Sequence, residues 1–534
     1  MSNFGEILKE VGEFGSFQKR LLAALCMPSF FVAFDIIGQV FTGRNFEHNC
    51  NTDWILEQGP NLTEDRQRNL TLPLNKDGQF ESCIMFTPVD LDLETIEAYG
   101  INKTTSCIDG WDYQASNGAS SSVTDFDLVC DQSGLIEVSQ SVYMAGYMVG
   151  AVTYGAISDR FGRRFAVLLS LFIVFSFGVG LAFSPNIYVF LVLKFFCGTS
   201  GGVMVMNTSV LALEWTDPSK AAVCTVLLII IYGVGLMLLS GLAFLIPNWR
   251  ILQLVLSGPV LPVLIFLYWF LPESARWYLS NGKKEEAQKM LERAARVNRR
   301  KVPYDLLDQV DMKVTTKRRN MFHIFRIPYL RKRTIIMGFN WFATSLLYYG
   351  LSLNVGGFGL NIYLTQFIFG FVEIPANLGS LLLIQHFGRR ICHSCFLIFG
   401  GVSCLLTLAI PKDLPVVVTV IAVLGKMAAT TSFSTAYVYT AELYPTVLRQ
   451  NGVGLNSMCA RMAGIFAPLI RLLDVFHHTI PMIIYGIIPI AAGGFCWLLP
   501  ETLNVQLQDH AEEKKTVNGH IGDNPGQIID EHKL

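Results

Sequence analysis

The stretch Gly155-Ala156-Ile157-Ser158-Asp159-Arg160-Phe161-Gly162-Arg163-Arg164 lies between two apolar runs and returns, shortened, as His386-Phe387-Gly388-Arg389-Arg390. Its glycines, Gly162 and Gly388, are 226 positions apart. Two more motifs repeat at an offset of 228. They are Glu214-Trp215-Thr216-Asp217-Pro218 with Glu442-Leu443-Tyr444-Pro445, and Leu271-Pro272-Glu273-Ser274 with Leu499-Pro500-Glu501-Thr502. A nearly constant offset across three motifs indicates that the chain consists of two related halves.

The composition and the length of the apolar runs indicate a membrane protein. Hydrophobic residues make up 51% of the 534 residues, charged residues make up 16%, and the mean hydropathy is +0.41, which excludes a soluble multidomain chain. Apolar runs of about 20 residues cross roughly 30 Å of hydrocarbon. We therefore expect an all-α membrane protein with twelve transmembrane helices in two six-helix, pseudo-symmetric halves, which is a transporter architecture. The expected spans are residues 20–42, 135–157, 165–183, 187–212, 222–243, 250–271, 333–354, 360–385, 391–410, 415–440, 452–473 and 479–499.

The basic residues predict the orientation of the chain. Lys and Arg cluster in residues 160–164, 276–333 and 388–390, and short basic loops stay in the cytoplasm. We expect a plasma-membrane protein with both termini in the cytoplasm and an uncleaved first span after Lys19-Arg20. The expected parts are a cytoplasmic N-terminus (1–19), an N-terminal half (20–271), a cytoplasmic loop with short helices (272–332), a C-terminal half (333–500) and a disordered tail (501–534). We expect a monomer in the lipid bilayer, with a weak PDZ-type ending at Leu534 as an open alternative.

Residues 43–134 form the expected extracellular domain between the first two spans. This domain holds four cysteines, which allow two disulfides in three pairings that the sequence does not distinguish: Cys50, Cys83, Cys107 and Cys130. It also holds three glycosylation sequons, at Asn61, Asn69 and Asn102. A fourth sequon, at Asn207, falls inside a predicted span and should stay unmodified. The other eight cysteines show no metal-ligand spacing, so we interpret them as packing residues.

The repeated motifs, the sequence Pro272-Glu273-Ser274-Ala275-Arg276-Trp277 and the large domain after the first span resemble solute carrier family 22. This family contains organic cation, organic anion and carnitine transporters of the major facilitator superfamily. The resemblance covers residues 1–502. Within the family, three segments are most similar to the organic anion branch and its nicotinate/urate exchanger: Asn298-Arg299-Arg300-Lys301, Tyr348-Tyr349-Gly350-Leu351-Ser352-Leu353 and Asp413-Leu414-Pro415-Val416-Val417-Val418-Thr419.

The repeated motifs predict a charge network that locks helix junctions and releases them when the helices tilt. The alternative is that the basic residues only anchor loops, but this does not explain the spacing of glycine and aspartate. The predicted gating residues are Gly155, Asp159, Arg160, Gly162, Arg163, Arg164, Glu214, Glu273, Arg276, Gly388, Arg389, Arg390, Glu442, Arg449 and Glu501. One departure puts the N-terminal network in doubt. Arg449 follows Glu442 by seven positions, whereas Ala221 follows Glu214, and the adjacent Lys220 is a candidate substitute.

Arg461 is the main candidate for substrate binding because an ionisable residue inside a span is costly unless it is paired or hydrated. A guanidinium can bind a carboxylate through two hydrogen bonds. The resemblance strengthens this interpretation, since organic anion transporters carry Arg at this position and cation transporters carry Asp. The alternative is permanent pairing with a protein carboxylate. An offset of 228 places Gly233 at the equivalent position of the first half, so the duplication does not copy this charge.

Aromatic and polar residues complete the predicted pocket. Six aromatics match pocket positions of the family: Tyr232, Trp341, Tyr348, Tyr349, Phe433 and Tyr437. Asn377 is neutral where the anion branch usually has Lys or Arg, which favours monoanions over dianions. Asp35 is unexpected in the first span, and pairing with Arg461, proton coupling, contact with a zwitterion or simple hydration remain open. Glu373 is the alternative to Asp35 as the carboxylate that supplies the counter-charge in the pocket.

These residues predict a secondary active transporter of small organic anions that works by anion exchange and alternating access. The alternatives are transport of zwitterions or organic cations through Asp35 or Glu373, and a receptor-like protein that does not transport. The sequence lacks a phosphate-binding loop, a nucleophile elbow and an HExxH motif, so we expect neither ATP-driven pumping nor enzymatic chemistry. We expect no cofactor, no metal and no nucleic-acid partner.

Overall fold

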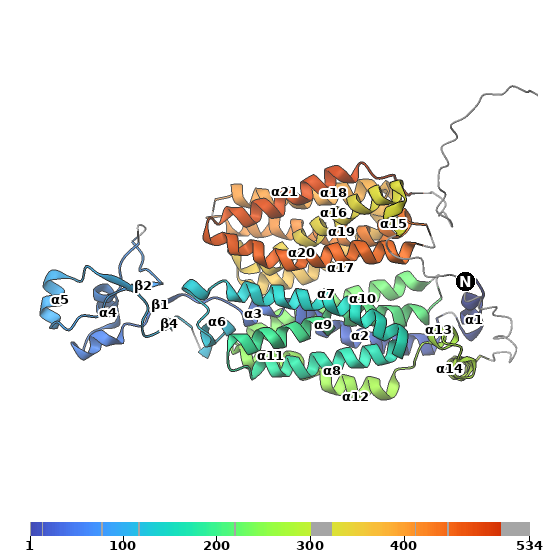
Figure 1. Cartoon of the computed structure of the whole chain (residues 1–534), viewed down its shortest axis with the longest axis horizontal. Helices are drawn as coiled ribbons and strands as arrows, with labels where there is room; N and C mark the ends of the chain where they lie inside the picture. Colours follow the sequence, from blue (N-terminus) through green and yellow to red (C-terminus); the bar gives the residue numbers. More distant parts are fainter. Residues whose placement is uncertain are drawn as a thin grey trace, which may run out of the picture.

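The computed structural model describes residues 2–12, 14–75, 78–115, 118–217, 220–300, 323–411, 413–445 and 448–503. Two helical halves lie side by side, and residues 43–134, here called the inserted domain, project from one end (Figure 1). We call this end of the bundle the domain end. The opposite end, which carries the repeated motifs, is the motif end. Residues 504–534 of the predicted tail, including Leu534, lie outside the described residues.

The N-terminal half contains six helical passes, the first and the last of which are interrupted. Gly38 separates α2 from α3. Gly258-Pro259 separates α11 from α12, because proline cannot donate the backbone hydrogen bond of a helix interior. The passes are α2 (Ser16–Ile37) with α3 (Gln39–Thr42), α7 (Leu135–Phe161), α8 (Arg163–Ala182), α9 (Ile187–Glu214), α10 (Ala221–Leu245), and α11 (Trp249–Ser257) with α12 (Val260–Phe270).

The C-terminal half repeats this order with six passes. They are α16 (Pro328–Leu353), α17 (Ile362–Phe387), α18 (Arg389–Ala409), α19 (Pro415–Leu443), α20 (Arg449–Arg471) and α21 (Thr479–Cys496), with the short η6 (Val355–Phe358) and η7 (Leu472–Val475) at the domain end. The expected architecture of two six-helix halves is therefore confirmed. The helices extend past the predicted spans, since α2 begins at Ser16 and α16 at Pro328, because hydropathy marks only the apolar part of a helix.

Short helices lie at the motif end, where α1 (Ser2–Gly12), α13 (Ala275–Ser280), α14 (Lys284–Val297) and α15 (His323–Arg326) cover the bundle. The predicted helix in the central loop is confirmed. The apolar face of α14, which includes Leu291, is buried and packs against α1 and α2. Asn298 ties this helix to the N-terminal segment, since its amide donates to Val11 O at 3.0 Å and accepts from Phe17 N at 2.8 Å.

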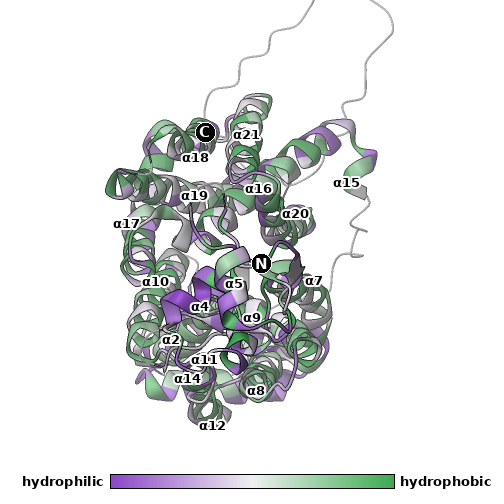
Figure 2. Cartoon of the chain, turned by 90° about the vertical axis from the view of Figure 1, so that its left-hand side faces the viewer, coloured by the Kyte–Doolittle hydropathy of each residue, from purple (hydrophilic) through white to green (hydrophobic). Residues whose placement is uncertain are grey.

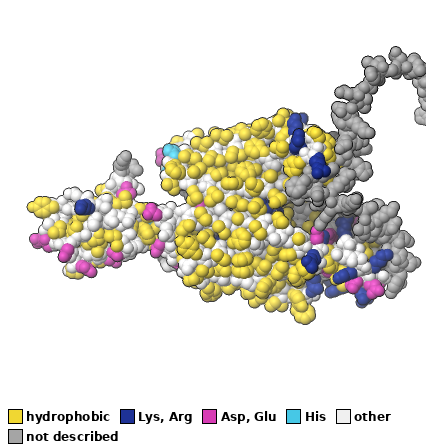
Figure 3. Space-filling model, in the orientation of Figure 1, with side chains coloured by type: hydrophobic (Ala, Val, Ile, Leu, Met, Phe, Trp, Pro, Cys, Tyr) yellow, Lys and Arg dark blue, Asp and Glu magenta, His cyan; other side chains and the backbone are white. Residues whose placement is uncertain are grey.

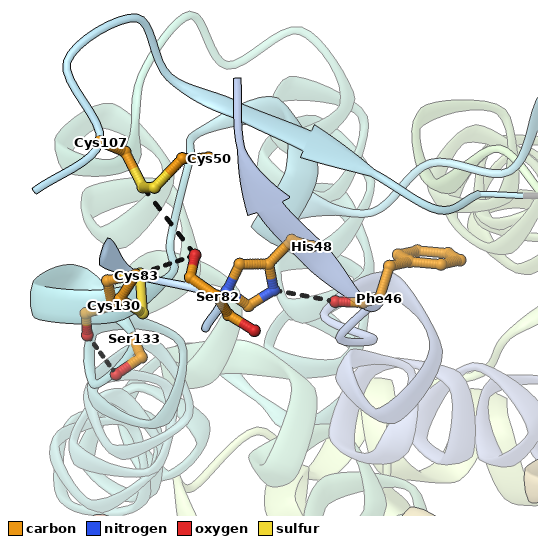
Figure 4. The surroundings of a disulfide bond; sticks show 8 residues. All are labelled: Phe46, His48, Cys50, Ser82, Cys83, Cys107, Cys130 and Ser133. Atoms are coloured by element: carbon orange, nitrogen blue, oxygen red, sulfur yellow. Dashed lines mark hydrogen bonds between the residues drawn. A yellow bond between two sulfur atoms is a disulfide. The ribbon is translucent and has the colours of Figure 1, made fainter. Parts of the chain in front are cut away.

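The inserted domain is small and is held by two disulfides (Figure 4). Cys50 pairs with Cys107 and Cys83 pairs with Cys130, which selects one of the three pairings that the sequence allows. The strands of this domain form two antiparallel pairs, and the cysteines lie in them or close to them. The elements are β1 (His48–Cys50) paired with β4 (Trp111–Tyr113), β2 (Ile84–Phe86) paired with β3 (Thr104–Ser106), η1 (Asp53–Glu57), α4 (Glu64–Thr71), α5 (Leu93–Tyr99), α6 (Ser122–Asp125) and η3 (Cys130–Gln132).

The surface of the bundle has the pattern of a membrane protein. A wide apolar band covers the helices, whereas charged side chains gather on the inserted domain and at the motif end (Figure 3). Seen from the domain end, the hydrophilic helix α4 and the mixed helix α5 stand in front of the mostly apolar bundle (Figure 2). Within the described residues, nine helices are long and apolar enough to cross a membrane. The three other passes are α7, α16 and α20, which carry more polar residues.

The two halves meet through equivalent helices, with α7 packed on α20 and α10 packed on α17. Within each half the helices pack closely. A Cβ atom at Gly150 of α7 would lie 1.9 Å from the carbonyl oxygen of Thr199 in α9, so only glycine allows this approach. Two of the three less apolar passes, α7 and α20, therefore lie where the halves face each other, which positions the candidate site.

Candidate substrate site and gate motifs

The repeated motif in the N-terminal half forms a charge network at the turn between α7 and α8. Gly162 has φ of 105°, and a Cβ there would lie 2.2 Å from a carboxylate oxygen of Glu273. The backbone N–H groups of Arg163 and Arg164 donate to Glu273 at 2.9 and 3.2 Å, so this carboxylate caps the N-terminus of α8. Burial raises the pKa of Glu273, while these N–H donors act in the opposite direction.

Arg163 connects this turn to two further carboxylates. Its guanidinium lies 3.2 Å from Asp159 and 3.3 Å from Glu214. The network therefore forms although position 221 is alanine, and the doubt raised by the missing arginine is removed. Lys220 is exposed. Arg160 lies apart from these carboxylates, with its guanidinium 5.3 Å from the centre of the Phe161 ring.

The C-terminal half repeats the same geometry. Gly388 has φ of 90°, and Glu501 accepts hydrogen bonds from the N–H groups of Arg389 at 2.8 Å and Arg390 at 3.1 Å. The Arg389 guanidinium lies 3.0 Å from Glu442. The duplication seen in the sequence is thus a duplicated charge network. Of the other predicted gating residues, Gly155 lies in α7, Arg276 in α13, and Arg449 at the start of α20.

Arg461 lies in the middle of α20 and is 7% exposed. It donates to Ser457 Oγ at 2.9 Å and contacts Met206 Sδ at 3.0 Å, and its guanidinium lies 4.9 Å from the centre of the Tyr147 ring. Its Nε atom has no partner. No carboxylate among the described residues forms an ion pair with Arg461, so the alternative of permanent pairing within the protein is not observed.

Five of the six predicted aromatics form one cluster across α16 and α19. The Trp341 ring lies 4.5 Å from that of Tyr437 and 5.9 Å from that of Phe433, measured between ring centres. Tyr348 contacts Phe433 and Tyr349 at 5.7 and 5.4 Å. The sixth aromatic, Tyr232 of α10, interacts with Tyr348 from the opposite half.

Tyr437 and Tyr349 connect this cluster to Arg461. Both tyrosines lie within electrostatic range of Arg461 and of Tyr147. Tyr437 nevertheless keeps 43% of its surface accessible. Its neighbours belong to both halves, since Tyr147 lies in α7 and Trp341 in α16. Arg461 and the aromatic cluster therefore lie close together where the two halves meet.

Glu373 and Asn377 have their polar groups engaged within the C-terminal half. Glu373, 4% exposed, lies 2.9 Å from Lys426 Nζ and accepts a hydrogen bond from Tyr348 at 2.5 Å. Lys426 also donates to Ser352 at 2.7 Å. Asn377 donates to Glu373 O at 2.8 Å and accepts from Ser434. These contacts join α17 to α16 and α19.

Asp35 lies near a second buried lysine, in the N-terminal half. Its carboxylate accepts a hydrogen bond from Tyr143 at 2.7 Å and interacts with Lys194. Lys194 is 4% exposed. Asp35 forms no ion pair with Arg461, so this option for its role is not observed. A small cavity of about 10 Å³, the size of one water molecule, adjoins Asp35 and Lys194.

Sequence reasoning missed four residues of this region: Lys194, Lys426, Tyr147 and Met206. The two lysines carried a usable signal, because each is an ionisable residue inside an apolar span. Tyr147 and Met206 carried none, since aromatic and thioether side chains are common in apolar helices.

Comparison with known proteins assigns the chain to a protein family. The sequence model of the family described as "Sugar (and other) transporter" matches residues 100–513. Solute carrier family 22 member 13 of Homo sapiens is 41% identical over 515 residues, which cover 96% of this chain and 93% of that protein. Solute carrier family 22 member 6-B of Xenopus laevis is 37% identical, covering 96% and 94%. Organic anion transporter 3 of Oryctolagus cuniculus is 35% identical, covering 96% and 93%. The chain belongs to solute carrier family 22.

Solved structures agree on the fold of this family 22 member. The xylose transporter XylE from E. coli, in a partially occluded inward open conformation, matches with a TM-score of 0.59 at 15% identity, covering 91% of this chain and 99% of XylE. The human organic anion transporter MFSD10 matches with a TM-score of 0.52 at 14% identity, covering 90% and 99%. The fold is that of the major facilitator superfamily. The relatives are membrane transporters rather than enzymes.

The contacts between the halves of this family 22 transporter show which end is closed. At the domain end, Glu137 of α7 lies 3.4 Å from Arg471 of α20, and the Phe41 and Tyr363 rings stack with centres 5.4 Å apart. Ser141 of α7 donates to Ile465 O of α20 at 3.0 Å. These contacts join the two halves at the domain end.

Proposed function

We propose that this family 22 transporter is a secondary active carrier of small organic monoanions that exchanges one anion for another by alternating access. The observation that carries the proposal is Arg461. Its buried guanidinium lies over the Tyr147 ring, within electrostatic range of Tyr349 and Tyr437, and has no carboxylate partner among the described residues. An uncompensated buried charge is costly, so a substrate carboxylate is the partner that the site lacks.

The charge balance supports monoanions as substrates. Lys194 and Lys426 are also buried cations near the centre of the bundle, but each faces a protein carboxylate. Asn377 is neutral, and its amide is occupied by Ser434 and by the backbone. Arg461 then offers one positive charge to a substrate, which favours nicotinate-like or urate-like anions over dianions.

Transport of zwitterions or cations has less support. That alternative needs a free carboxylate in the site. Glu373 is paired with Lys426 at 2.9 Å, and Asp35 is engaged by Tyr143 and Lys194. Neither carboxylate offers its charge to a ligand in this conformation.

The proposed orientation places the inserted domain outside the cell and the motif end in the cytoplasm of a plasma-membrane protein. The three sequon asparagines of the inserted domain are exposed, whereas Asn207 is 6% exposed inside α9. The basic side chains at the motif end agree with the rule that positive loops stay inside (Figure 3). In this orientation the contacts that join the two halves lie on the extracellular side.

Uptake into cells that express the protein tests the proposal. Labelled nicotinate, urate and p-aminohippurate should be taken up above background, and tetraethylammonium and carnitine should not. Preloading the cells with lactate, succinate or glutarate identifies the exchanged anion by faster uptake of the label. Uptake of the cations without uptake of the anions would overturn the proposed substrate class, and anion uptake that no preloaded anion accelerates would overturn exchange.

A further inference from the structure

A cavity of about 400 Å³ lies between the two halves at the domain end. Its walls come from both halves and include six polar or aromatic residues: Gln39, Arg44, Glu137, Gln140, Tyr363 and Arg471. The volume falls within the range of small-molecule sites, which is about 300 to 1,000 Å³. This cavity is separate from the surroundings of Arg461, since none of the residues that contact Arg461 lines it.

Two arginines give the cavity a positive character. Arg44 is exposed, donates to the Tyr363 hydroxyl at 3.3 Å and lies over the Phe46 and Tyr363 rings at 5.2 and 5.9 Å from their centres. No carboxylate of the described residues pairs with it. Arg471 donates to Leu353 O at 3.0 Å and lies 3.4 Å from Glu137. The two guanidiniums face only one carboxylate, so the cavity carries one excess positive charge.

Two buried glutamines line the cavity on the side of the N-terminal half. Gln39 is 7% exposed and Gln140 is 1% exposed. Gln39 Nε2 donates to Ile136 O and Ser139 Oγ, both at 2.7 Å, and Gln140 Nε2 donates to Ile36 O at 3.2 Å. These hydrogen bonds fix both side chains, so this wall of the cavity is uncharged and held in place.

We propose that this cavity is a second, outer binding site for aromatic organic anions. Arg44 and Arg471 bind the anionic group, and the Tyr363 ring packs against the ring of the ligand. The proposal rests on the proposed function, because the outer site takes the same class of anion as the central site. In the proposed orientation the site is reached from outside the cell, before the substrate reaches Arg461.

The outer site has a mechanical consequence. Glu137 belongs to the N-terminal half and Arg471 to the C-terminal half, so their ion pair joins the halves at this end. A bound anion competes with Glu137 for Arg471. Loading the outer site therefore weakens one contact that keeps the domain end closed.

Side-specific kinetics of Arg44→Gln test the site. We expect the KM for urate uptake from outside to rise about fivefold, the effect of losing one exposed charge contact. Vmax and the KM for efflux from preloaded cells should stay within about twofold of wild type. Arg66→Gln is the matched control, since Arg66 is an exposed arginine of the inserted domain paired with Glu97, outside the cavity. Surface biotinylation corrects every rate for the amount of protein at the membrane. An unchanged outside KM, or an equal rise on both sides, would overturn the proposal.

Direct binding separates the outer site from the central one. Saturation-transfer NMR with urate and the purified full-length protein should detect binding in Arg461→Ala and lose it in the Arg44→Gln/Arg461→Ala double variant. Loss of binding in Arg461→Ala alone would overturn the outer site. If the wild-type protein does not take up anions at all, the proposed function fails, and this binding measurement still decides the outer site.

Discussion

Replacing Glu373 with glutamine should destabilise the protein strongly because it leaves a buried lysine without its counter-charge. Glu373 and Lys426 lie 2.9 Å apart, with side chains 4% and 2% exposed. Removing one member of such a pair costs about 3 to 5 kcal/mol. Glutamine keeps the shape of the side chain and can still accept the hydrogen bond from Tyr348, so the change isolates the charge.

A double-mutant cycle measures this effect. We expect Glu373→Gln and Lys426→Met each to lower the free energy of unfolding, and the double variant to lose less than the sum, with a coupling of about 2 to 3 kcal/mol. The assay is SDS-driven unfolding of the purified protein in mixed micelles, followed by tryptophan fluorescence. Glu64→Gln is the control, because Glu64 is 76% exposed in its pair with Arg68 and should change stability by less than about 1 kcal/mol. Additive losses, or a Glu373→Gln variant as stable as this control, would refute the pairing and return Glu373 to the candidates for binding a cation.

Three further predictions concern the gate, the disulfides and the glycans. Gly162→Ala should destabilise the protein by about 1 to 3 kcal/mol, because φ of 105° and the nearby Glu273 carboxylate both exclude a side chain. The control is Gly155→Ala, which should leave the stability unchanged because the added Cβ atom meets no atom within 4 Å. Equal melting temperatures of the two variants would contradict this account. Cys50→Ser should destabilise the inserted domain by about 2 to 5 kcal/mol and make it sensitive to protease. Cys395→Ser is the control, because Cys395 is a free, exposed cysteine, and this variant should keep the protease resistance of the wild type. Equal protease resistance of the two variants would argue against the Cys50–Cys107 bond. Replacing the three sequon asparagines of the inserted domain should remove the gel shift caused by glycosidase, whereas Asn207→Gln should leave it, and a shift that survives the triple replacement would contradict the proposed orientation.

Motif spacing in the sequence was enough to predict the fold and the repeated charge network at the motif end. The offset of 228 between Glu273 and Glu501 indicated two halves, and in the structure both carboxylates cap the same turn in their own half. Apolar run length located the passes but not their ends, because a helix can continue past the apolar part, as α16 does from Pro328.

The sequence could not show which charges are already paired. Arg461, Lys194 and Lys426 are all cations inside apolar spans, and spacing alone does not indicate which of them faces a carboxylate on another helix. Those partners are set by packing between helices that are distant in sequence. The equivalent of Arg461 in the first half, Gly233, shows the same limit. It packs beside Gly370 of α17, so the first half uses this position for helix contact rather than for charge.

The central claim is that the Arg461 guanidinium binds the carboxylate of the substrate. The measurement that tests it most directly is concentration-dependent uptake of labelled nicotinate by Arg461→Ala and Arg461→Lys, with surface expression measured in the same cells. Losing a hydrogen-bonded charge contact of about 1.5 to 3 kcal/mol predicts that Vmax/KM falls by about tenfold to 150-fold in Arg461→Ala, with partial recovery in Arg461→Lys. Nicotinate uptake at the wild-type rate in Arg461→Ala, at equal surface expression, would contradict the account.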